Sequence, residues 1–189
     1  MLFMLTMPEL QAEREADRIE ELIARLADGD IEAMAPLYDL VRSPVYAYAL
    51  SLLRDPHGAE DVLHDCCLRV LNAAGGYVPR GKPMAFIMTV TRNLCYDRLA
   101  EANRHVSPEP AEWERLLKTD DVPTSLAAAE WLNTLSEADR QIVVLHVLAG
   151  FKHRETAEFM GMPTATVITR YSRAIKALRK HIIRERMEN

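Results

Sequence analysis

The last third of the chain gathers basic side chains that can bind phosphate groups and base edges. Residues 131–189 carry 10 basic and 6 acidic side chains, whereas residues 1–102 carry 10 and 16, and residues 103–130 carry 3 and 6. The net charge of -5 therefore conceals a cationic end of the kind that meets nucleic acid. The cations that lie off the apolar stripe of the final helix are Arg170, Arg173, Lys176, Arg179, Lys180, Arg184 and Arg186.

A helix-turn-helix pattern introduces these cations, over residues 153–167. The segment has the spacing of a short helix, a three-residue turn and a second helix. Gly161 can take the left-handed conformation that ends the first helix, and Ala157 is small enough for two helices to cross closely. Thr164 is the expected N-cap of the second helix. The alternative is a basic, solvated helix within a bundle, and the turn favours DNA contact instead.

The second helix of this pattern predicts how DNA is read. Its buried stripe consists of Val167, Tyr171, Ala174, Ile175, Leu178 and Ile182. The first residues of a recognition helix reach base edges in the major groove, whereas cations farther along contact bases or phosphates. We therefore predict that duplex DNA is contacted by Thr164, Ala165, Thr166, Arg170, Arg173 and Lys176.

Few residues in the rest of the chain are spaced to bind a metal ion or to catalyse a reaction. His64 lies close to Cys66 and Cys67, but adjacent cysteines on a helix point about 100° apart and the chain has no CxxC pair. We predict no metal site and expect at least two of the three thiols, Cys66, Cys67 and Cys95, to pack in the core, without distinguishing which. Because the chain lacks a glycine-rich phosphate loop, a nucleophile elbow and an HExxH segment, we also expect no catalytic residue, cofactor or small-molecule substrate.

The elements that position these residues are all expected to be helices, because apolar residues recur at three- and four-residue steps. We predict an all-α fold with two small helical domains, a four-helix unit over 10–102 and a helix-turn-helix unit over 125–186. Residues 103–124 are rich in proline and acid and predict an extended linker. The expected helices cover 10–27, 31–53 (with a possible bend at Pro44), 59–73, 84–102, 125–133, 137–149, 153–160 and 164–184.

The compartment is predicted from the first ten residues and from the cysteines. MLFMLTMPEL is apolar, but it is too short for a membrane span and lacks the basic flank and cleavage site of a signal peptide. Three cysteines without regular spacing argue against a disulfide framework and fit a reducing compartment. We therefore expect a cytoplasmic protein without a membrane span.

Two sets of residues resemble the sigma-70 family of RNA polymerase specificity factors, in its compact extracytoplasmic-function (ECF) group. Residues 135–141, 150–151 and 170–174, together with the helix-turn-helix, are similar to the promoter-binding fourth region of that family. Residues 37–38, 55–65 and 91–99 are similar to its second region. The resemblance implies that the first unit binds core polymerase and opens the minus-ten element, while the second unit binds the minus-thirty-five element.

The resemblance also assigns residues to these tasks. It implies that the helix over 59–73 docks on a coiled coil of core polymerase, and its alternative is a solvated charged face. The residues implied at that contact are Asp61, His64, Asp65 and Arg69. The loop 75–83 and the helix around residue 93 are implied to hold an unstacked minus-ten base. The residues implied there are Tyr77, Arg80, Lys82, Asn93, Asp97 and Arg98, with Tyr77 either stacking on the base or anchoring its loop.

The partners implied by the resemblance are core RNA polymerase, promoter DNA and an anti-sigma factor that buries both domains. The chain departs from the family pattern at three places. Ala85 stands where a tryptophan is usual, residues 99–104 lack an arginine cluster, and Ile168 stands where a basic residue is common. Less positive charge weakens phosphate binding. Two alternatives therefore stay open: a sigma-like protein that binds an anti-sigma factor or another partner without melting DNA, and a helix-turn-helix regulator that acts without polymerase.

Overall fold

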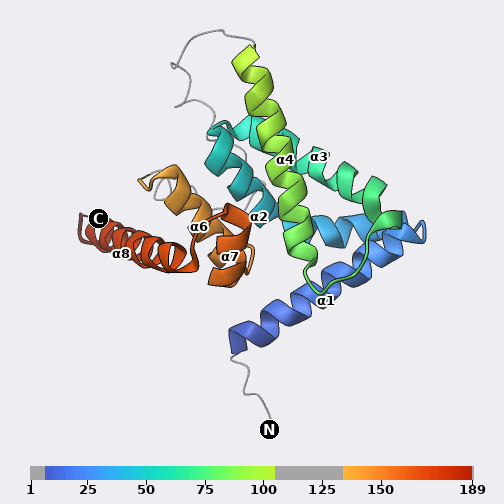
Figure 1. Cartoon of the computed structure of the whole chain (residues 1–189), viewed down its shortest axis with the longest axis horizontal. Coiled ribbons are helices and arrows are strands. Elements are labelled where there is room, and N and C mark those ends of the chain that lie inside the picture. The colour runs from blue at the N-terminus through green and yellow to red at the C-terminus, as the bar shows by residue number, and fades with distance from the viewer. Residues whose placement is uncertain (1–6, 105–133, 189) are drawn as a thin grey trace.

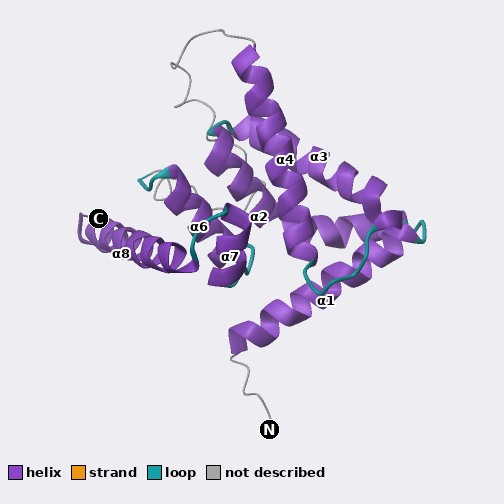
Figure 2. Cartoon of the chain, in the orientation of Figure 1, coloured by secondary structure: helices purple, strands orange, loops and turns teal. Residues whose placement is uncertain are grey.

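The computed structural model describes residues 7–104 and 134–188, and the side chains of residues 13–102 and 134–180. Within these ranges the chain is built from helices and short connections, with no strand (Figure 2). The elements are α1 (Met7–Ala27), η1 (Ile31–Ala33), α2 (Met34–Leu53), α3 (Pro56–Ala73), η2 (Ala74–Gly76), α4 (Pro83–Arg104), α6 (Glu137–Val147), α7 (His153–Met160) and α8 (Thr164–Glu188) (Figure 1). The predicted all-α fold is confirmed. None of the described helices combines the length and apolarity that a membrane crossing requires.

Helix α3 begins three residues earlier than the sequence predicted. The Asp55 side chain accepts hydrogen bonds from the backbone N–H groups of His57 (3.2 Å) and Gly58 (3.0 Å), and Pro56 occupies the first turn. A proline there loses no hydrogen bond, because the first N–H groups of a helix have no partner within it. The predicted helix over 125–133 and most of the predicted linker lie outside the described residues.

Helix α2 is the centre of the N-terminal unit and packs against α1, α3 and α4. Leu37, Val41, Val45, Tyr48, Ala49 and Leu52, which recur at three- and four-residue steps, are buried, and Met34 and Tyr38 of the same stripe are half-buried. Tyr46 and Ala47 lie off that stripe and are buried as well. The helix continues through Pro44, where the sequence allowed a bend. Contact on several sides explains the extra burial, since α2 also packs against α6 of the second unit.

One apolar core joins the two units. The largest buried cluster contains residues of α1 to α4 and, in the same cluster, Val144, Leu145, Ala149 and Phe151 from the second unit. Smaller clusters inside the second unit hold α8 on α6 and α7. The sequence predicted two units separated by a linker and did not predict that they pack directly on each other.

Candidate nucleic-acid interface

The turn of the helix-turn-helix is closed by backbone hydrogen bonds at the end of α7. Gly161 has a φ of 63°. Its N–H donates to the Glu158 carbonyl (3.3 Å), and the N–H of Met162 donates to the Ala157 carbonyl (2.9 Å). These two bonds form a Schellman motif, which requires a left-handed residue where Gly161 stands. The predicted role of Gly161 is confirmed.

The crossing of the two helices is packed as the pattern predicts, while the start of α8 is shifted by one residue. Ala157, Val167 and Ile142 form a small buried cluster between α6, α7 and α8. The N–H of Val167 donates to the Pro163 carbonyl (3.2 Å), so Pro163 stands at the N-cap position and Thr164 is the first helical residue. The prediction of Thr164 as the N-cap is therefore wrong, because the proline already occupies that position.

Helix α8 exposes the residues that the sequence predicts to contact duplex DNA. Its first residues, Thr164, Ala165 and Thr166, are exposed, as are the cations Arg173, Lys176, Arg179 and Lys180. Arg170 differs, because it is half-buried and its Nε lies 3.6 Å from Oδ1 of Asp139 on α6. That separation is long for a hydrogen bond, so the pair is held by charge. Arg170 therefore also ties α8 to α6.

A cluster of aromatic rings, from His146, His153 and Tyr171, packs α8 against α6 and α7. The His146 and His153 rings are stacked with centroids 4.2 Å apart, and both contact Tyr171 of α8, at 4.5 and 5.0 Å. Nδ1 of His146 lies 2.6 Å from the Phe151 carbonyl, which can only accept, so this nitrogen carries the proton. Burial lowers the pKa of His153, and His146 adds to that effect.

The predicted polymerase contact is a charged face of α3. Asp61, His64 and Arg69 are exposed and Asp65 is half-buried. Arg98 of α4 joins this face, because its Nη1 and Nη2 atoms lie 3.0 Å from Oδ2 of Asp61 and of Asp65. Burial alone would lower the pKa of Arg98, but hydrogen bonds to the two carboxylates raise it, since they stabilise the charged guanidinium. The structure thus places Arg98 with α3 rather than with the other predicted minus-ten residues.

The remaining minus-ten candidates lie on α4 and on the loop before it. Asn93 and Asp97 are exposed, and Tyr96 between them is 53% exposed. These three side chains, at i, i+3 and i+4, share one side of the helix and are called the α4 face below. Sequence reasoning missed Tyr96, although its spacing from Asn93 was a visible signal. In the loop, Arg80 is exposed, whereas Lys82 forms an ion pair with Glu155 of α7 at 3.0 Å.

Tyr77 anchors the loop, which is the second of the two roles that the sequence left open. Its hydroxyl donates to Oε1 of Glu20 on α1 (3.1 Å), and its ring centroid lies 5.1 Å from that of Phe86. Burial and the Glu20 carboxylate raise the pKa of Tyr77 to about 12. The N–H of Gly81 donates to the same Glu20 oxygen (2.9 Å). The loop is therefore held on α1 at both of its ends.

Two of the three thiols lie in the core, as predicted. Cys66 and Cys95 are buried, and burial raises the pKa of each to about 12. The Cys66 sulfur lies 3.4 Å from Oγ1 of Thr91. Among the described residues, no group of three or more histidine, cysteine or acidic side chains is arranged to hold a metal ion. The buried thiols serve as apolar packing groups.

Two family models match the chain in the order in which these surfaces occur. The model of sigma-70 region 2 matches residues 37–105, and the model of sigma-70 region 4 matches residues 125–178. The chain belongs to the sigma-70 family. The α3 and α4 faces of this sigma-70 protein fall within the region 2 match, and its helix-turn-helix falls within the region 4 match.

Curated relatives place this sigma-70 protein in the ECF group. It is 27% identical over 171 residues to the ECF RNA polymerase sigma factor SigK of Mycobacterium sp. (strain KMS), covering 85% of this chain and 89% of the relative. It is 28% identical over 177 residues to the ECF RNA polymerase sigma factor BldN of Streptomyces coelicolor, covering 88% and 67%.

Solved structures share the fold of this sigma-70 protein. The sigma factor RpoE, crystallised in complex with the anti-sigma factor NepR from Bartonella quintana, matches with a TM-score of 0.55 at 22% identity, covering 75% of this chain and 92% of that chain. CnrH in complex with the cytosolic domain of CnrY matches with a TM-score of 0.55 at 23% identity, covering 88% and 97%. At these identities the likeness concerns the fold alone.

Proposed function

We propose that this protein is an ECF-type sigma factor that binds core RNA polymerase and directs promoter-specific transcription initiation. The observation that carries the proposal is the pairing, in one chain, of an exposed recognition helix with charged and polar faces on α3 and α4. These surfaces occur in the order of regions 2 and 4 of the family. The two relatives described above, which match most of the chain, are named ECF RNA polymerase sigma factors.

Helix α8 is proposed to read the minus-thirty-five element. Its exposed first turn can enter the major groove, because Thr164, Ala165 and Thr166 carry small side chains that allow close approach. Arg173 and Lys176 project from the next turns and are free of the ion pair that holds Arg170. Arg173 is therefore assigned to base or phosphate contact. Arg170 is assigned both to DNA contact and to holding α8 on α6.

The α4 face is proposed to hold an unstacked base of the minus-ten element. Extruding a base costs a few kcal/mol, so the site must return stacking and hydrogen bonds. Asn93 and Asp97 supply donors and acceptors for a base edge. Tyr96 supplies an accessible ring, whereas the Tyr77 ring is already packed against Phe86. We therefore transfer the stacking role from Tyr77 to Tyr96.

The charged face of α3 is proposed to dock on core polymerase. Asp61, His64 and Arg69 project into solvent from successive turns of the helix, and Arg98 fixes the carboxylates of Asp61 and Asp65. A face whose charges are held in place loses less side-chain entropy on binding than a mobile one. The protein would act in the cytoplasm, where its polymerase works. It would make and break no covalent bond, since binding free energy melts the DNA and polymerase performs the synthesis.

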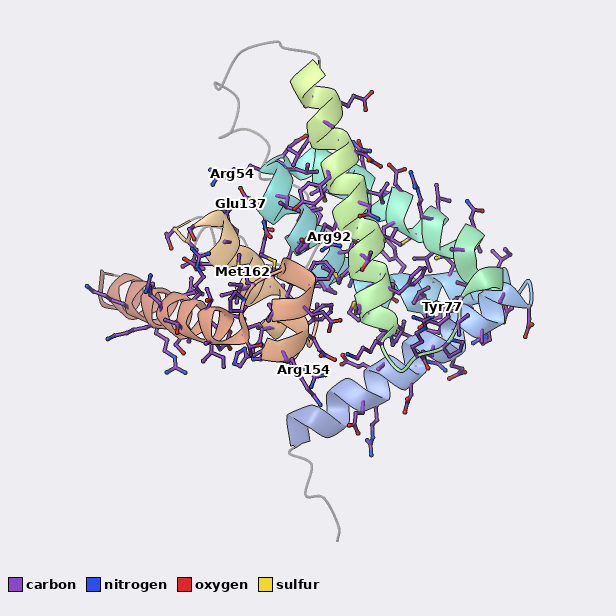
Figure 3. All side chains as sticks on the ribbon, viewed as in Figure 1. Arg54, Tyr77, Arg92, Glu137, Arg154 and Met162 are labelled. Atoms are coloured by element: carbon purple, nitrogen blue, oxygen red, sulfur yellow. The ribbon has the colours of Figure 1, made fainter. Side chains whose placement is uncertain are left out.

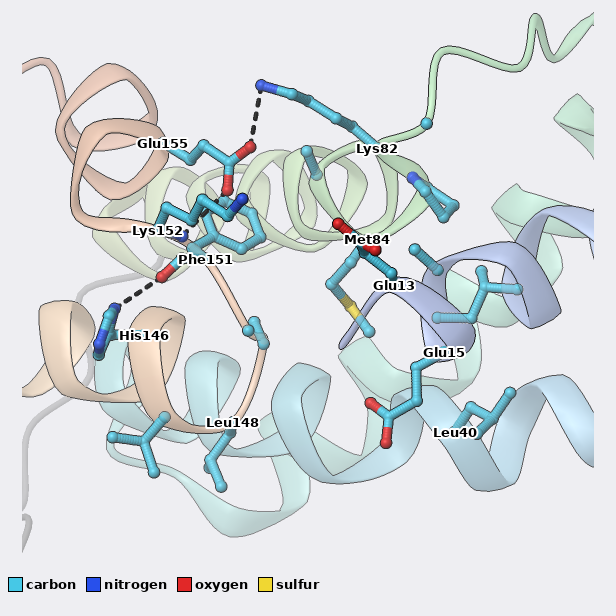
Figure 4. Close-up of a pocket in the computed structure, with 18 residues that line it drawn as sticks. Glu13, Glu15, Leu40, Lys82, Met84, His146, Leu148, Phe151, Lys152 and Glu155 are labelled. Atoms are coloured by element: carbon cyan, nitrogen blue, oxygen red, sulfur yellow. Dashed lines mark hydrogen bonds and ion pairs between the residues drawn. The ribbon is translucent and has the colours of Figure 1, made fainter. Parts of the chain in front are cut away.

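An anti-sigma factor is proposed as the regulatory partner. The structural neighbours RpoE and CnrH were solved in complexes, RpoE with the anti-sigma factor NepR and CnrH with the cytosolic domain of CnrY. Here a cleft of about 740 Å³ is lined from both units, by α1, the start of α4 and the connection between α6 and α7 (Figure 4). Its rim carries both signs of charge, with Glu13 and Glu15 on one side and Lys152 on the other. A partner inserted there would contact both domains at once.

A second candidate function is a sigma-like protein that binds its partner without melting DNA. The observations that favour it are Ala85, the single cation within residues 99–104, and the engagement of Lys82 and Arg98 with carboxylates of the protein itself. A third is a helix-turn-helix regulator that needs only α8. The three candidates differ in whether polymerase binding, DNA melting or both are required.

Reconstituted transcription separates the three candidates. The purified protein is captured with core RNA polymerase, and the transcripts that the complex makes on genomic DNA are sequenced. The sigma factor proposal expects transcripts that start at a limited set of sites with shared upstream elements. Capture of polymerase without such transcripts would favour the second candidate. Tight binding to duplex DNA without any capture of polymerase would favour the third.

A further inference from the structure

Helix α8 carries a row of uncharged side chains along its exposed side. Ala165, Ile168, Thr169 and Ser172 are exposed and follow one another at i, i+3, i+4 and i+7, so they lie along one side of the helix. We call these four residues the α8 row. In Figure 3, α8 lies at the edge of the molecule with side chains extending outward from it. The row therefore occupies a part of the recognition helix that duplex DNA can reach.

The buried side of α8 fixes the direction in which this row points. Val167 is fully buried and packs with Ile142 of α6 and Ala157 of α7. Successive residues of an α-helix are about 100° apart, so Ile168 and Thr169 stand about 100° and 200° from Val167 around the helix axis. Docking of α8 through Val167 therefore turns the α8 row outward.

Ile168 is the largest apolar group of the row, and 44% of its surface is exposed. In the described part of the chain, it is not a member of the apolar clusters that hold α8 on α6 and α7. A single exposed isoleucine is common on protein surfaces, so its place within the recognition helix carries the argument. An apolar side chain that stays in water forgoes the free energy of burial, which a bound partner would release.

The polar groups near Ile168 are already engaged within the protein. The Thr169 hydroxyl donates to the Ala165 carbonyl at 2.9 Å, so its proton is used inside the helix. Arg170 lies 3.6 Å from Asp139 of α6, and residues 164–171, the first two turns of α8, contain no other cation. The first two turns therefore approach DNA mainly with methyl groups.

This surface matches one chemical feature of the major groove. Thymine presents its C5-methyl group there and accepts contact from apolar side chains, whereas arginine and lysine bond the two acceptors of guanine. A cation at position 168 would favour guanine. Isoleucine offers guanine no donor, so a guanine beneath it would lose hydrogen bonds to water without replacement.

We propose that Ile168 selects thymine in the duplex element that α8 binds, by packing on the C5-methyl group in the major groove. Ala165 and Thr169 complete the apolar surface around that group. The inference deepens the proposed function and rests on one part of it, the entry of α8 into the major groove. It names the class of DNA as a duplex with A·T pairs where the first two turns of α8 make contact. Arg173 and Lys176 strengthen binding from the turns that follow.

The first test finds the element and then removes single methyl groups from it. The full-length protein, alone and in complex with core RNA polymerase, selects from duplexes of random sequence. Thymines of the selected element are then replaced one at a time by deoxyuridine, which lacks only the methyl group. At least one replacement should weaken binding about fourfold, which corresponds to roughly 0.8 kcal/mol for one buried carbon group. Equal affinities at every position would overturn the inference, as would failure of both forms to select an element.

The second test assigns the preference to Ile168. Ile168→Ala should bind the thymine and deoxyuridine duplexes with nearly equal affinity, because the outer carbons of the side chain are gone. Ile31→Ala, at an isoleucine of η1 that is 63% exposed, is the matched control and should keep the fourfold difference. A difference that persists in I168A would overturn the role of Ile168.

A gain of specificity provides the converse measurement. Ile168→Arg should bind a G·C pair at the decisive position more tightly than an A·T pair, because arginine bonds the guanine acceptors. In the wild type, 5-methylcytosine should bind better than cytosine at that position, since it carries the methyl group that thymine has. Equal binding of cytosine and 5-methylcytosine by the wild type would count against methyl contact.

The third test separates this inference from the proposed function. Promoters identified by reconstituted transcription are made with thymine or with deoxyuridine in the element that α8 contacts, and the wild type should use the thymine template better. If the protein directs promoter-dependent transcription equally from both templates, the inference fails and the proposed function stands. If Ile168 selects thymine in duplex DNA but core polymerase makes no promoter-dependent transcript, the proposed function fails and the inference stands.

Discussion

Arg98 of α4 lies with its Nη2 atom 3.0 Å from Oδ2 of Asp65 on α3. The other terminal nitrogen is at the same distance from Asp61, one turn earlier. One guanidinium thus fixes two carboxylates of the face that is proposed to meet polymerase. A residue that the sequence assigned to DNA is placed to organise a protein contact.

Replacing Arg98 by glutamine should therefore weaken capture of core polymerase and slightly destabilise the fold. The pair is partly exposed, so the free energy of unfolding should fall by only about 0.5–1 kcal/mol. Urea unfolding and a polymerase pull-down measure the two effects. Arg14→Gln, on the exposed side of α1, is the matched control. Normal polymerase capture by R98Q would show that the α3 carboxylates need no fixing.

Tyr96 is predicted to stack on an unpaired base. Tyr96→Ala should reduce promoter melting, detected by permanganate reactivity of unpaired thymines, while Tyr96→Phe should retain it because the ring alone does the stacking. The expected loss is about 1–3 kcal/mol for one base. Tyr77→Phe serves as the comparison, since its hydroxyl bonds Glu20 and its ring is packed. Equal promoter melting by Y96A and wild type would show that Tyr96 does not stack on the unpaired base.

The two arginines near the start of α8 should differ when mutated. Arg173→Ala should lower affinity for the promoter duplex by about 1–3 kcal/mol if it contacts a base, with no change in stability. Arg170→Ala should also destabilise the second unit, because it removes the partner of Asp139. Fluorescence anisotropy across a salt series, combined with urea unfolding, distinguishes the two. Identical profiles for both variants would contradict the structural assignment of Arg170.

Gly161→Ala should destabilise the helix-turn-helix by about 1–2 kcal/mol, the cost of a left-handed conformation for a residue with a side chain. No atom lies within 4 Å of the added methyl group, so the cost is conformational rather than steric. Gly75→Ala is the control, since it also has open space and its φ is not positive. Thermal unfolding of the two variants should rank G161A clearly below G75A.

Stability should decrease with falling pH through His153. Its pKa is lower in the folded chain than the ordinary value of 6.5, so unfolding takes up a proton in the interval between the two values. The contribution of His153 is complete above pH 6.5 and declines as the pH falls below it. His153→Phe, which can still stack on His146, should flatten this part of the profile, whereas the exposed His57→Gln should not. Urea unfolding at pH 7.5 and 5.5 provides the comparison.

Local pattern was sufficient for the helices and for the helix-turn-helix. The roles of Gly161, Ala157 and Val167 follow from backbone geometry within a few residues, and they are confirmed. Thr164 was misplaced by one position, because a proline can occupy an N-cap whose carbonyl accepts the first helical hydrogen bond. Helix boundaries depend on such short-range competition and are read less reliably than helix existence.

The sequence did not predict the contacts between residues that lie far apart in the chain. Arg92 and Lys82 are 67 and 73 positions from their partners, Phe159 and Glu155, and nothing in the residues around them indicates a helix of the other unit. The burial of Tyr46 and Ala47 was missed for the same reason, because a periodicity argument assumes that one side of a helix faces solvent. Tyr77 and Arg98 could be placed near DNA by resemblance, but their actual partners depend on the packing of α1 and α3.

The position of α2, touched by α1, α3, α4 and α6, bears on how the protein would behave if its backbone were severed. A cut introduced between residues 105 and 133 would leave each fragment with an apolar side that, within the described parts of the chain, packs against the other fragment. The fragments should therefore remain associated and behave as a single species until a denaturant separates them. Either fragment produced alone would present that side to solvent and invite aggregation.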